Sequence, residues 1–264
     1  MKVRETMNDI LNGERWRVDE GDCLTWLRSQ KTASVDCCVT SPPYNTLNTN
    51  KQARTYRPGD KWMKKTREGY ADTMPEDDYQ EWLCAVVREA LRVTNGLVWV
   101  NHKTRYRNGV GIHPLHILKD FPLWAEVVWD KCGATTFNQR RFATSNEYLF
   151  AFGRPRFWDP SNDGLLSVWR IAQDTNTEHP CPFPERIVEP LVAASCPPDG
   201  IVIDPFTGSG TTGAVALRLG RRFLGCELNP EYVAMSRNRI ANYHVRPVHP
   251  VAADDEHQTT LFDL

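Results

Sequence analysis

Residues 201–227 read IVIDPFTGSGTTGAVALRLGRRFLGCE, and this stretch decides the fold class. An apolar run predicts a buried strand over 201–204, and a segment of helical periodicity follows over 211–219. Gly220 lies just beyond that predicted helix, where glycine commonly ends one, and a second apolar run ends at Glu227. The order strand, helix, strand predicts two parallel strands of an α/β sheet.

The rest of the chain repeats this alternation of strands and helices. We therefore expect an α/β fold with a single doubly wound, mostly parallel sheet in residues 1–242. Polar segments at 45–70 and 153–178 interrupt the alternation, and neither shows the periodicity of a helix or strand. Further strands are predicted at 35–40, 97–100, 124–129 and 147–152, and helices at 24–34, 75–95, 115–119, 184–194 and 230–242.

The composition is typical of a globular protein. Its 264 residues include 41% apolar and 25% charged side chains, with a formal net charge of −1. These proportions exclude a disordered, collagenous or membrane chain. No run of about 18 apolar residues is present, and Met1–Thr6 lacks the apolar core of a secretory signal. We therefore expect a cytoplasmic protein.

Cysteine and histidine spacing predicts no metal site. The eight cysteines form no C-x-x-C pair, so we expect reduced and mostly buried thiols. His113 and His116 are the one local histidine pair in the sequence, and no acidic or cysteine cluster accompanies them.

The glycine-rich turn after Asp204 predicts a nucleoside site. Glycines at Gly208 and Gly210 would let a ligand approach the backbone, and Glu227 stands where an acid accepts both ribose hydroxyls. Gly213 completes a three-glycine dinucleotide fingerprint, so a nicotinamide or flavin enzyme is a competing interpretation, as is a merely packed turn. The Asp204 carboxylate would repel a pyrophosphate but attract a sulfonium or ammonium group, which favours a methionine-bearing nucleoside.

A second motif, Ser41-Pro42-Pro43-Tyr44, follows the predicted strand 35–40. The two prolines fix φ and lack N–H groups, so the loop offers acceptors in a rigid frame. An amino group held between the Ser41 hydroxyl and the Pro42 carbonyl would have a less conjugated, more nucleophilic lone pair, while Tyr44 stacks on the attached ring. The alternative is a tight turn at a strand end.

Together, the two motifs resemble those of the S-adenosylmethionine-dependent amino-group DNA methyltransferases, in the arrangement where S-P-P-Y precedes F-x-G-x-G. The resemblance runs from about Val18 to Asn242 and implies a class I methyltransferase sheet with one antiparallel strand. It implies that the methionine end of the cofactor lies at the glycine turn, the ribose at Glu227, the adenine near Asp22, and a closing segment at 179–184. The implied cofactor residues are Asp22, Phe183, Asp204, Phe206, Thr207, Gly208, Ser209, Gly210, Thr211 and Glu227.

The resemblance also implies a reaction on a flipped base of double-stranded DNA, without metal or covalent intermediate. Ser41 favours cytosine N4 as the target, because a hydroxyl accepts less strongly than the acid or amide usual in adenine N6 enzymes. Adenine N6 remains open, as do RNA methylation and a nucleic-acid-binding protein without activity. Cytosine C5 chemistry fails, because Cys181 precedes the glycine turn and has no Glu-Asn-Val partner.

The DNA-facing surface is predicted from charge. Segment 45–70 holds seven basic and two acidic residues, a net charge of +5, and could contact phosphates, although a solvated loop is the alternative. The resemblance places target recognition at 153–178. The predicted DNA-binding residues are Lys51, Arg54, Arg57, Lys61, Lys64, Lys65, Arg67, Arg140 and Arg141.

The tail 243–264 loses periodicity and is expected to be a flexible linker. Its end carries Q-x-x-L-F at Gln258, Leu261 and Phe262, which resembles the peptide that docks bacterial replication and repair proteins on the sliding clamp. The alternative is that Leu261 and Phe262 dock on their own domain. The family resemblance and this peptide suit a protein encoded by a bacterium or a phage.

Overall fold

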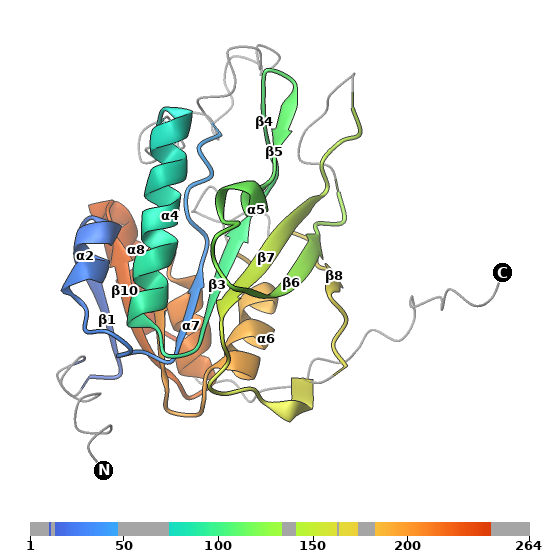
Figure 1. The fold of residues 1–264 in the computed structure, drawn as a ribbon. Coiled ribbons are helices and arrows are strands. Elements are labelled where there is room, and N and C mark those ends of the chain that lie inside the picture. The colour runs from blue at the N-terminus through green and yellow to red at the C-terminus, as the bar shows by residue number, and fades with distance from the viewer. Residues whose placement is uncertain are drawn as a thin grey trace.

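An eight-stranded sheet forms the centre of the fold (Figure 1), in the order β1-β10-β9-β2-β3-β7-β6-β8. The computed structural model describes residues 11, 14–46, 74–133, 141–162, 164–173 and 183–243. The strands of this sheet are β1 (Trp16–Glu20), β2 (Cys37–Thr40), β3 (Leu97–His102), β6 (Leu123–Asp130), β7 (Asn146–Gly153), β8 (Val168–Arg170), β9 (Ile201–Asp204) and β10 (Arg222–Glu227).

Strand directions confirm the predicted sheet. Every neighbouring pair is parallel except those of β7, which runs antiparallel to β3 and β6. The sheet is therefore mostly parallel, with one antiparallel strand among those described. The α-helices are α2 (Cys23–Ser29), α4 (Glu76–Val93), α5 (Pro114–Ile117), α6 (Glu185–Ser195), α7 (Thr211–Arg218) and α8 (Pro230–Ala241).

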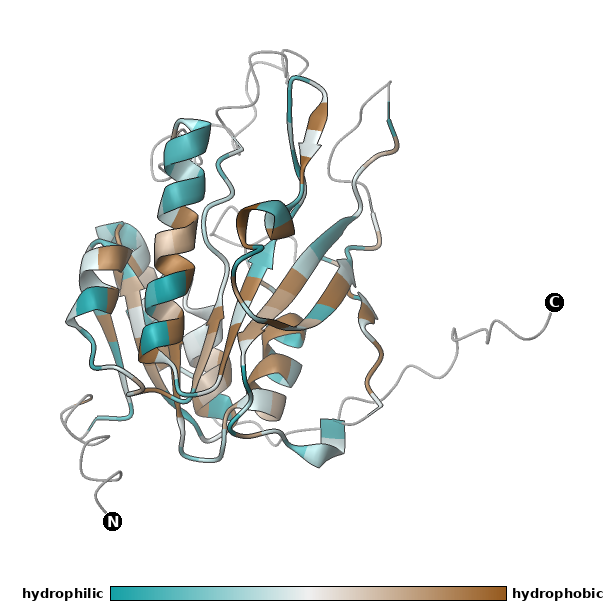
Figure 2. Cartoon of the chain, in the orientation of Figure 1, coloured by the Kyte–Doolittle hydropathy of each residue, from teal (hydrophilic) through white to brown (hydrophobic). Residues whose placement is uncertain are grey.

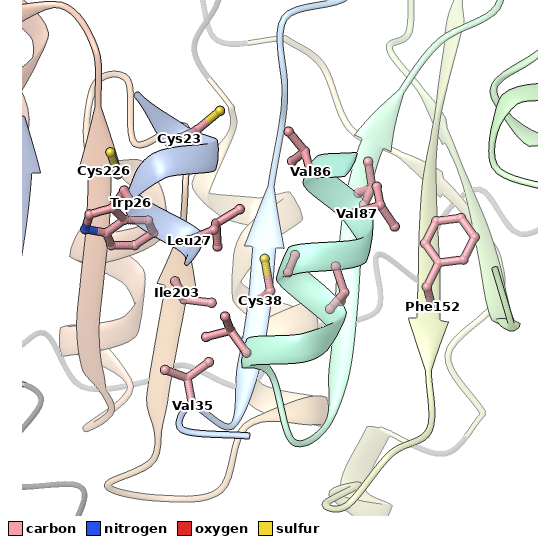
Figure 3. Packing of buried hydrophobic residues seen from close by; sticks show 14 of the residues in the cluster. Cys23, Trp26, Leu27, Val35, Cys38, Val86, Val87, Phe152, Ile203 and Cys226 are labelled. Carbon is pink, nitrogen blue, oxygen red and sulfur yellow. The ribbon is translucent and has the colours of Figure 1, made fainter. Parts of the chain in front are cut away.

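Helices cover both faces of the sheet because its strands are apolar on both sides. On β2, Cys38 packs toward α2, α4 and α5, whereas Cys37 and Val39 pack toward α6, α7 and α8. Figure 3 shows Cys38 of β2 beside α4, whose Val86 and Val87 belong to the same buried cluster. Figure 2 shows brown strands between helices whose outer faces are largely teal, as a buried sheet requires.

Several elements differ from the sequence-based expectation. Segment 153–178 was expected to lack elements, yet it contains the short helix η2 (Pro160–Asn162) and β8, which pairs with β6. Strand β8 has three residues and an exposed Val168, so its own pattern is too short to predict it. Helix α2 ends at Ser29, five residues before the expected end, because the Gln30 backbone leaves helical geometry. The antiparallel hairpin of β4 (Arg105–Arg107) and β5 (Val110–Ile112) was not predicted.

The topology places the candidate site. Strands β2 and β9 are neighbours, but the chain proceeds from β2 toward β3 and from β9 toward β10, in opposite directions across the sheet. A crevice forms beyond the carboxyl ends of parallel strands at such a switch point, and ligands of open α/β sheets bind there. The loop after β2 is S-P-P-Y, and the turn after β9 is the glycine turn. The sheet order therefore brings the two predicted motifs side by side.

Candidate active site

The glycine turn owes its shape to two left-handed residues. Gly208 has a φ of 52° and Gly210 a φ of 81°, a region that L side chains rarely adopt. A Cβ on Gly210 would also lie 2.9 Å from the Cα of Ser236 in α8. Gly213 has a packing role, because a Cβ there would collide with Ile240 and Phe223. Backbone and helix therefore approach more closely here than any side chain would permit.

Glu227 ends β10 and lies against this turn. Its Oε2 accepts from the Gly208 N–H at 2.8 Å, and its Oε1 accepts from the Asn229 N–H at 3.0 Å. Each carboxylate oxygen has a further lone pair, so the partly exposed side chain retains capacity for two hydroxyl donors. The acid predicted to hold a ribose is thus oriented by the backbone of the glycine turn.

Asp22 lies at the same edge, beyond β1. The Gly21 N–H donates to the Glu227 carbonyl at 3.0 Å, so the start of α2 is adjacent to the end of β10. Asp22 is the N-cap of α2 and accepts from the backbone N–H and the hydroxyl of Thr25, both at 2.9 Å. This cap explains the residue structurally and still leaves its second oxygen for another donor.

Phe183 immediately precedes Pro184, the N-cap of α6, and packs against the core cluster on that face. Arg239 connects the start of α6 with the glycine turn, because it donates to Glu185 at 2.7 Å and to the Thr211 hydroxyl at 2.8 Å. The same guanidinium donates to the Ser209 hydroxyl at 3.2 Å. Phe183 therefore precedes a helix whose first residue is linked to the glycine turn.

Asp204 connects the glycine turn with the strand that precedes S-P-P-Y. Its buried carboxylate accepts from the Thr40 hydroxyl at 2.7 Å and from the Phe206 N–H at 3.0 Å. Thr40 is the last residue of β2, so this hydrogen bond connects the strand before S-P-P-Y to the strand before the glycine turn. Burial raises the pKa of Asp204 to about 6, against these hydrogen bonds, which lower it.

The S-P-P-Y loop is anchored from helix α4. Tyr79 donates its hydroxyl hydrogen to the Pro43 carbonyl at 2.7 Å and lies 2.8 Å from Nε2 of His102. Because that hydroxyl has one hydrogen, His102 must in turn donate from Nε2. Burial lowers the pKa of His102 to about 3, so the ring is neutral and can fill this role. In this loop Pro42 is buried, whereas Ser41 and Tyr44 are partly buried.

Three side chains beneath the loop were missed by the sequence interpretation. The Tyr44 hydroxyl lies 2.6 Å from Asn101 Oδ1 and 3.1 Å from Glu147 Oε2, which are alternative acceptors for its one hydrogen. Lys131 donates to Glu147 at 2.7 Å. The available signal was a polar residue at one end of each of three apolar runs: near the end of β3, just after β6 and near the start of β7. Sheet order alone brings those ends together.

Aromatic contacts occur beside both motifs. The Phe206 ring, in the glycine turn, meets the Trp82 ring of α4 edge-on at 5.6 Å between centroids. The Tyr44 ring is 4.9 Å from His102, and Lys103 Nζ is 5.1 Å from its centroid. Trp82 of α4 therefore borders a predicted cofactor residue.

Most of the predicted DNA-binding residues lie outside the described residues. Arg141 is described, and its guanidinium lies 3.5 Å from the centroid of Tyr106, on the β4–β5 hairpin. The hairpin rises beyond the active edge of the sheet (Figure 1). The residues outside are Lys51, Arg54, Arg57, Lys61, Lys64, Lys65, Arg67 and Arg140.

The structure also bears on the predictions about metal ligands, membrane-spanning helices and cysteines, for the residues that it describes. Within the described ranges, no group of three or more potential metal ligands occurs, and no helix is long and apolar enough to span a membrane. The cysteines there are free, and burial raises the pKa of thiols such as Cys37, to about 12. Cys181 and the Gln258, Leu261 and Phe262 peptide lie outside the described residues.

The fold and site define an α/β enzyme of the class I methyltransferase type. A family model described as DNA methylase matches residues 35–238. The chain is also 30% identical to Type II methyltransferase M.XycI of Xanthomonas campestris pv. cyanopsidis, over 89% of this chain and 90% of that protein. The chain therefore belongs to the DNA methylase family of amino-group methyltransferases, which act on cytosine N4 or adenine N6.

Other relatives and solved structures agree with this family. DNA adenine methyltransferase YhdJ of Escherichia coli (strain K12) is 25% identical, over 83% of this chain and 81% of its own. PvuII DNA methyltransferase (cytosine-N4-specific) has a TM-score of 0.66 at 21% identity, covering 86% of each chain. TTHA0409 of Thermus thermophilus, complexed with S-adenosyl-L-methionine, has a TM-score of 0.60 at 26% identity, over 85% of this chain and 93% of that one. The cofactor of this DNA methyltransferase is S-adenosylmethionine.

Proposed function

We propose that this chain is a site-specific DNA methyltransferase that methylates the exocyclic amino group of a flipped base, with cytosine N4 as the favoured target. One observation carries the proposal. The Thr40 to Asp204 hydrogen bond, 2.7 Å long, holds the S-P-P-Y loop against the glycine turn. An acceptor for an amino group and a nucleoside site are thereby kept within one crevice, as transfer between two bound molecules requires.

The glycine turn fits S-adenosylmethionine. Positive φ at Gly208 and Gly210 lets a ligand reach the backbone, and Glu227 retains lone pairs for ribose hydroxyls. Asp204 provides a carboxylate beneath the turn, and at neutral pH it is mostly ionised, because its pKa is raised only to about 6. When bound, the cofactor supplies an electrophilic methyl group on a cationic sulfonium. We assign the adenine to the side of Asp22 and the closing contact to Phe183.

The S-P-P-Y loop would position the nucleophile. Ser41 and the Pro42 carbonyl would accept the two amino hydrogens, and Tyr44 would stack on the base. The nitrogen lone pair then forms the new bond to carbon, the carbon–sulfur electron pair goes to sulfur, and the nitrogen afterwards loses a proton to water. Tyr79 supports this role, because its hydroxyl donates to the Pro43 carbonyl at 2.7 Å and so holds the loop in place. Positioning is the principal catalytic device.

The choice of cytosine N4 rests on Ser41. The family includes proteins named for either base, since YhdJ is a DNA adenine methyltransferase and the PvuII enzyme is cytosine-N4-specific. A neutral hydroxyl in the acceptor position suits the cytosine amino group. Adenine N6 is the alternative product of the same geometry.

We further propose that 45–70 contacts DNA phosphates. The residues that flank its undescribed part meet beside S-P-P-Y, because Asn45 Nδ2 donates to the Met74 carbonyl at 2.8 Å. Target recognition is assigned to 153–178. Within it, the Asp159 N–H donates to the Ala194 carbonyl at the far end of α6, whereas β8 ends with Arg170 beside Asp130, the last residue of β6.

The tail peptide with Gln258, Leu261 and Phe262 is proposed to bind the bacterial sliding clamp, which would concentrate the enzyme on new DNA. A labelled 255–264 peptide should bind the clamp with micromolar affinity, and Leu261→Ala and Phe262→Ala should weaken binding. The measurement is fluorescence anisotropy. No binding at about 100 micromolar would end this part of the proposal.

The central experiment is methyl transfer from labelled S-adenosylmethionine to duplex DNA or to RNA, followed by digestion and mass spectrometry of the nucleosides. We expect N4-methylcytosine in DNA at a defined sequence, and much slower formation of the same product with Ser41→Ala. N6-methyladenine would overturn the base assignment alone. Product in RNA and not in DNA, or no product at all, would overturn the proposed substrate or activity.

A further inference from the structure

A chain of hydrogen bonds runs from Ser41 into the interior of the sheet. The Ser41 hydroxyl lies 3.0 Å from the Tyr44 hydroxyl and 3.2 Å from Asn101 Oδ1. The Tyr44 hydroxyl reaches Asn101 at 2.6 Å and Glu147 at 3.1 Å. Glu147 accepts from Lys131 at 2.7 Å. One continuous network therefore joins the predicted amino-group acceptor to a buried ion pair.

The ion pair between Lys131 and Glu147 is almost completely buried. The side chains of Lys131 and Glu147 are 2% and 7% exposed. Two charges removed from water this completely seldom stabilise a fold more than apolar residues of the same volume would. A buried pair that also contacts a reactive loop therefore calls for an explanation in the chemistry of that loop.

The hydrogens of the network can be counted. Ser41 and Tyr44 each have one hydroxyl hydrogen, and the acceptors around them are Asn101 Oδ1, Glu147 Oε2 and the Tyr44 oxygen. Asn101 cannot offer its amide hydrogens instead, because Nδ2 donates to the Tyr148 carbonyl at 3.0 Å. The Ser41 hydroxyl thus has two inner acceptors within reach, the Tyr44 oxygen at 3.0 Å and Asn101 Oδ1 at 3.2 Å, toward which its hydrogen can be directed.

The consequence concerns the outer side of Ser41. A serine hydroxyl, unlike a carboxylate, can donate as well as accept. With its hydrogen directed inward to Tyr44 or Asn101, its lone pairs are left for an incoming N–H donor. The negative charge of Glu147, at the inner end of the network, also stabilises the positive charge that develops on the amino nitrogen during methylation.

We propose that Glu147, held by Lys131, is a positioning residue that acts through Tyr44 and Asn101 to keep the Ser41 hydroxyl as an acceptor toward the target amino group. The inference rests on the proposed function and goes beyond it, because it assigns a role to three residues outside S-P-P-Y. It also gives the Tyr44 hydroxyl a role distinct from the stacking of its ring.

The test uses variants that keep shape. Tyr44→Phe retains the ring and removes the hydroxyl, and Glu147→Gln retains size and removes the charge. A matched control is Glu189→Gln, which loses an ion pair to Arg218 (2.7 Å) away from the S-P-P-Y loop. The measurements are the single-turnover rate of methyl transfer to duplex DNA, cofactor affinity by calorimetry, and the thermal unfolding midpoint.

We expect Tyr44→Phe and Glu147→Gln each to slow transfer by about tenfold or more, with cofactor affinity within about twofold of wild type. The double variant should be no slower than Tyr44→Phe, because Glu147 acts through that hydroxyl. Glu189→Gln should shift the unfolding midpoint comparably and leave the rate unchanged.

Three results would overturn the inference. They are an unchanged rate in Glu147→Gln, losses that multiply in the double variant, and a rate loss in Glu189→Gln that matches its loss of stability. In each of these the wild-type enzyme still methylates DNA, so the proposed function stands. A wild-type protein inert toward DNA overturns the proposed function and this inference together.

Discussion

The cofactor half and the target half of the site are built in different ways. In the cofactor half, Asp204, Gly208 and Glu227 come from one β-α-β unit, and backbone groups make most of the contacts. In the target half, side chains from Ser41 to Glu147 meet through hydrogen bonds between side chains. Cofactor geometry is thus a local property of the chain, whereas target geometry depends on the order of strands.

The largest effect is expected where this local geometry is strictest. Gly210→Ala should lower the free energy of unfolding by about 2–5 kcal/mol and abolish cofactor binding, because left-handed strain adds to overlap with Ser236. Chemical denaturation and calorimetry measure the two effects. The matched control is Gly109→Ala, which has a similar φ of 83° but meets no atom within 4 Å. Equal losses in both variants would refute the role of overlap.

Next, the two halves should separate kinetically. Ser41→Ala should slow methyl transfer roughly 100- to 1000-fold with little change in cofactor affinity, because it removes an acceptor of the reacting group. Glu227→Ala should weaken cofactor binding about 10- to 100-fold, as expected for charge-assisted hydrogen bonds. Calorimetry with S-adenosylmethionine tests both variants. The same cofactor affinity in the two would contradict the division of the site.

The contact between the halves should give the fold a specific pH dependence. Burial raises the pKa of Asp204 to about 6 in the folded protein, from 3.8. Its contribution to stability is therefore fully present below about pH 4 and is lost as the pH rises through about 6. In the protein without cofactor, Asp204→Asn should remove this pH-dependent part of the free energy of unfolding. The difference in free energy of unfolding between wild type and variant should therefore change between pH 4 and 7 and then level off. A constant difference across that range would contradict the buried carboxylate.

The smallest effect should come from outside both halves. Lys64→Ala with Lys65→Ala should weaken binding to all DNA sequences alike and lower the slope of log affinity against log salt by about 0.9 per phosphate contact. Fluorescence anisotropy at several salt concentrations measures the slope. Lys119→Ala, an exposed lysine of the stretch between α5 and β6, serves as the control. An unchanged slope in the double variant would make segment 45–70 a solvated loop.

The sequence predicted the features that depend on short separations along the chain. Residues 201–227 were sufficient to predict β9, α7, β10 and the glycine turn, because a strand followed by a helix fixes the turn between them. Segment 153–178 was a failure of the same method. A three-residue edge strand such as β8 forms because β6 offers hydrogen bonds, which no pattern within Val168–Arg170 can reveal.

The fold class, the two motifs and, through the order of these motifs, the family could be inferred from the sequence alone. Only the tertiary structure decided that Asn101, Lys131 and Glu147 belong to the site. Each lies at one end of an apolar run beside another polar residue, and polar residues in such places usually meet solvent. Their buried network arises because β7 runs antiparallel between β3 and β6, so that the first residues of one strand meet the last residues of the other two.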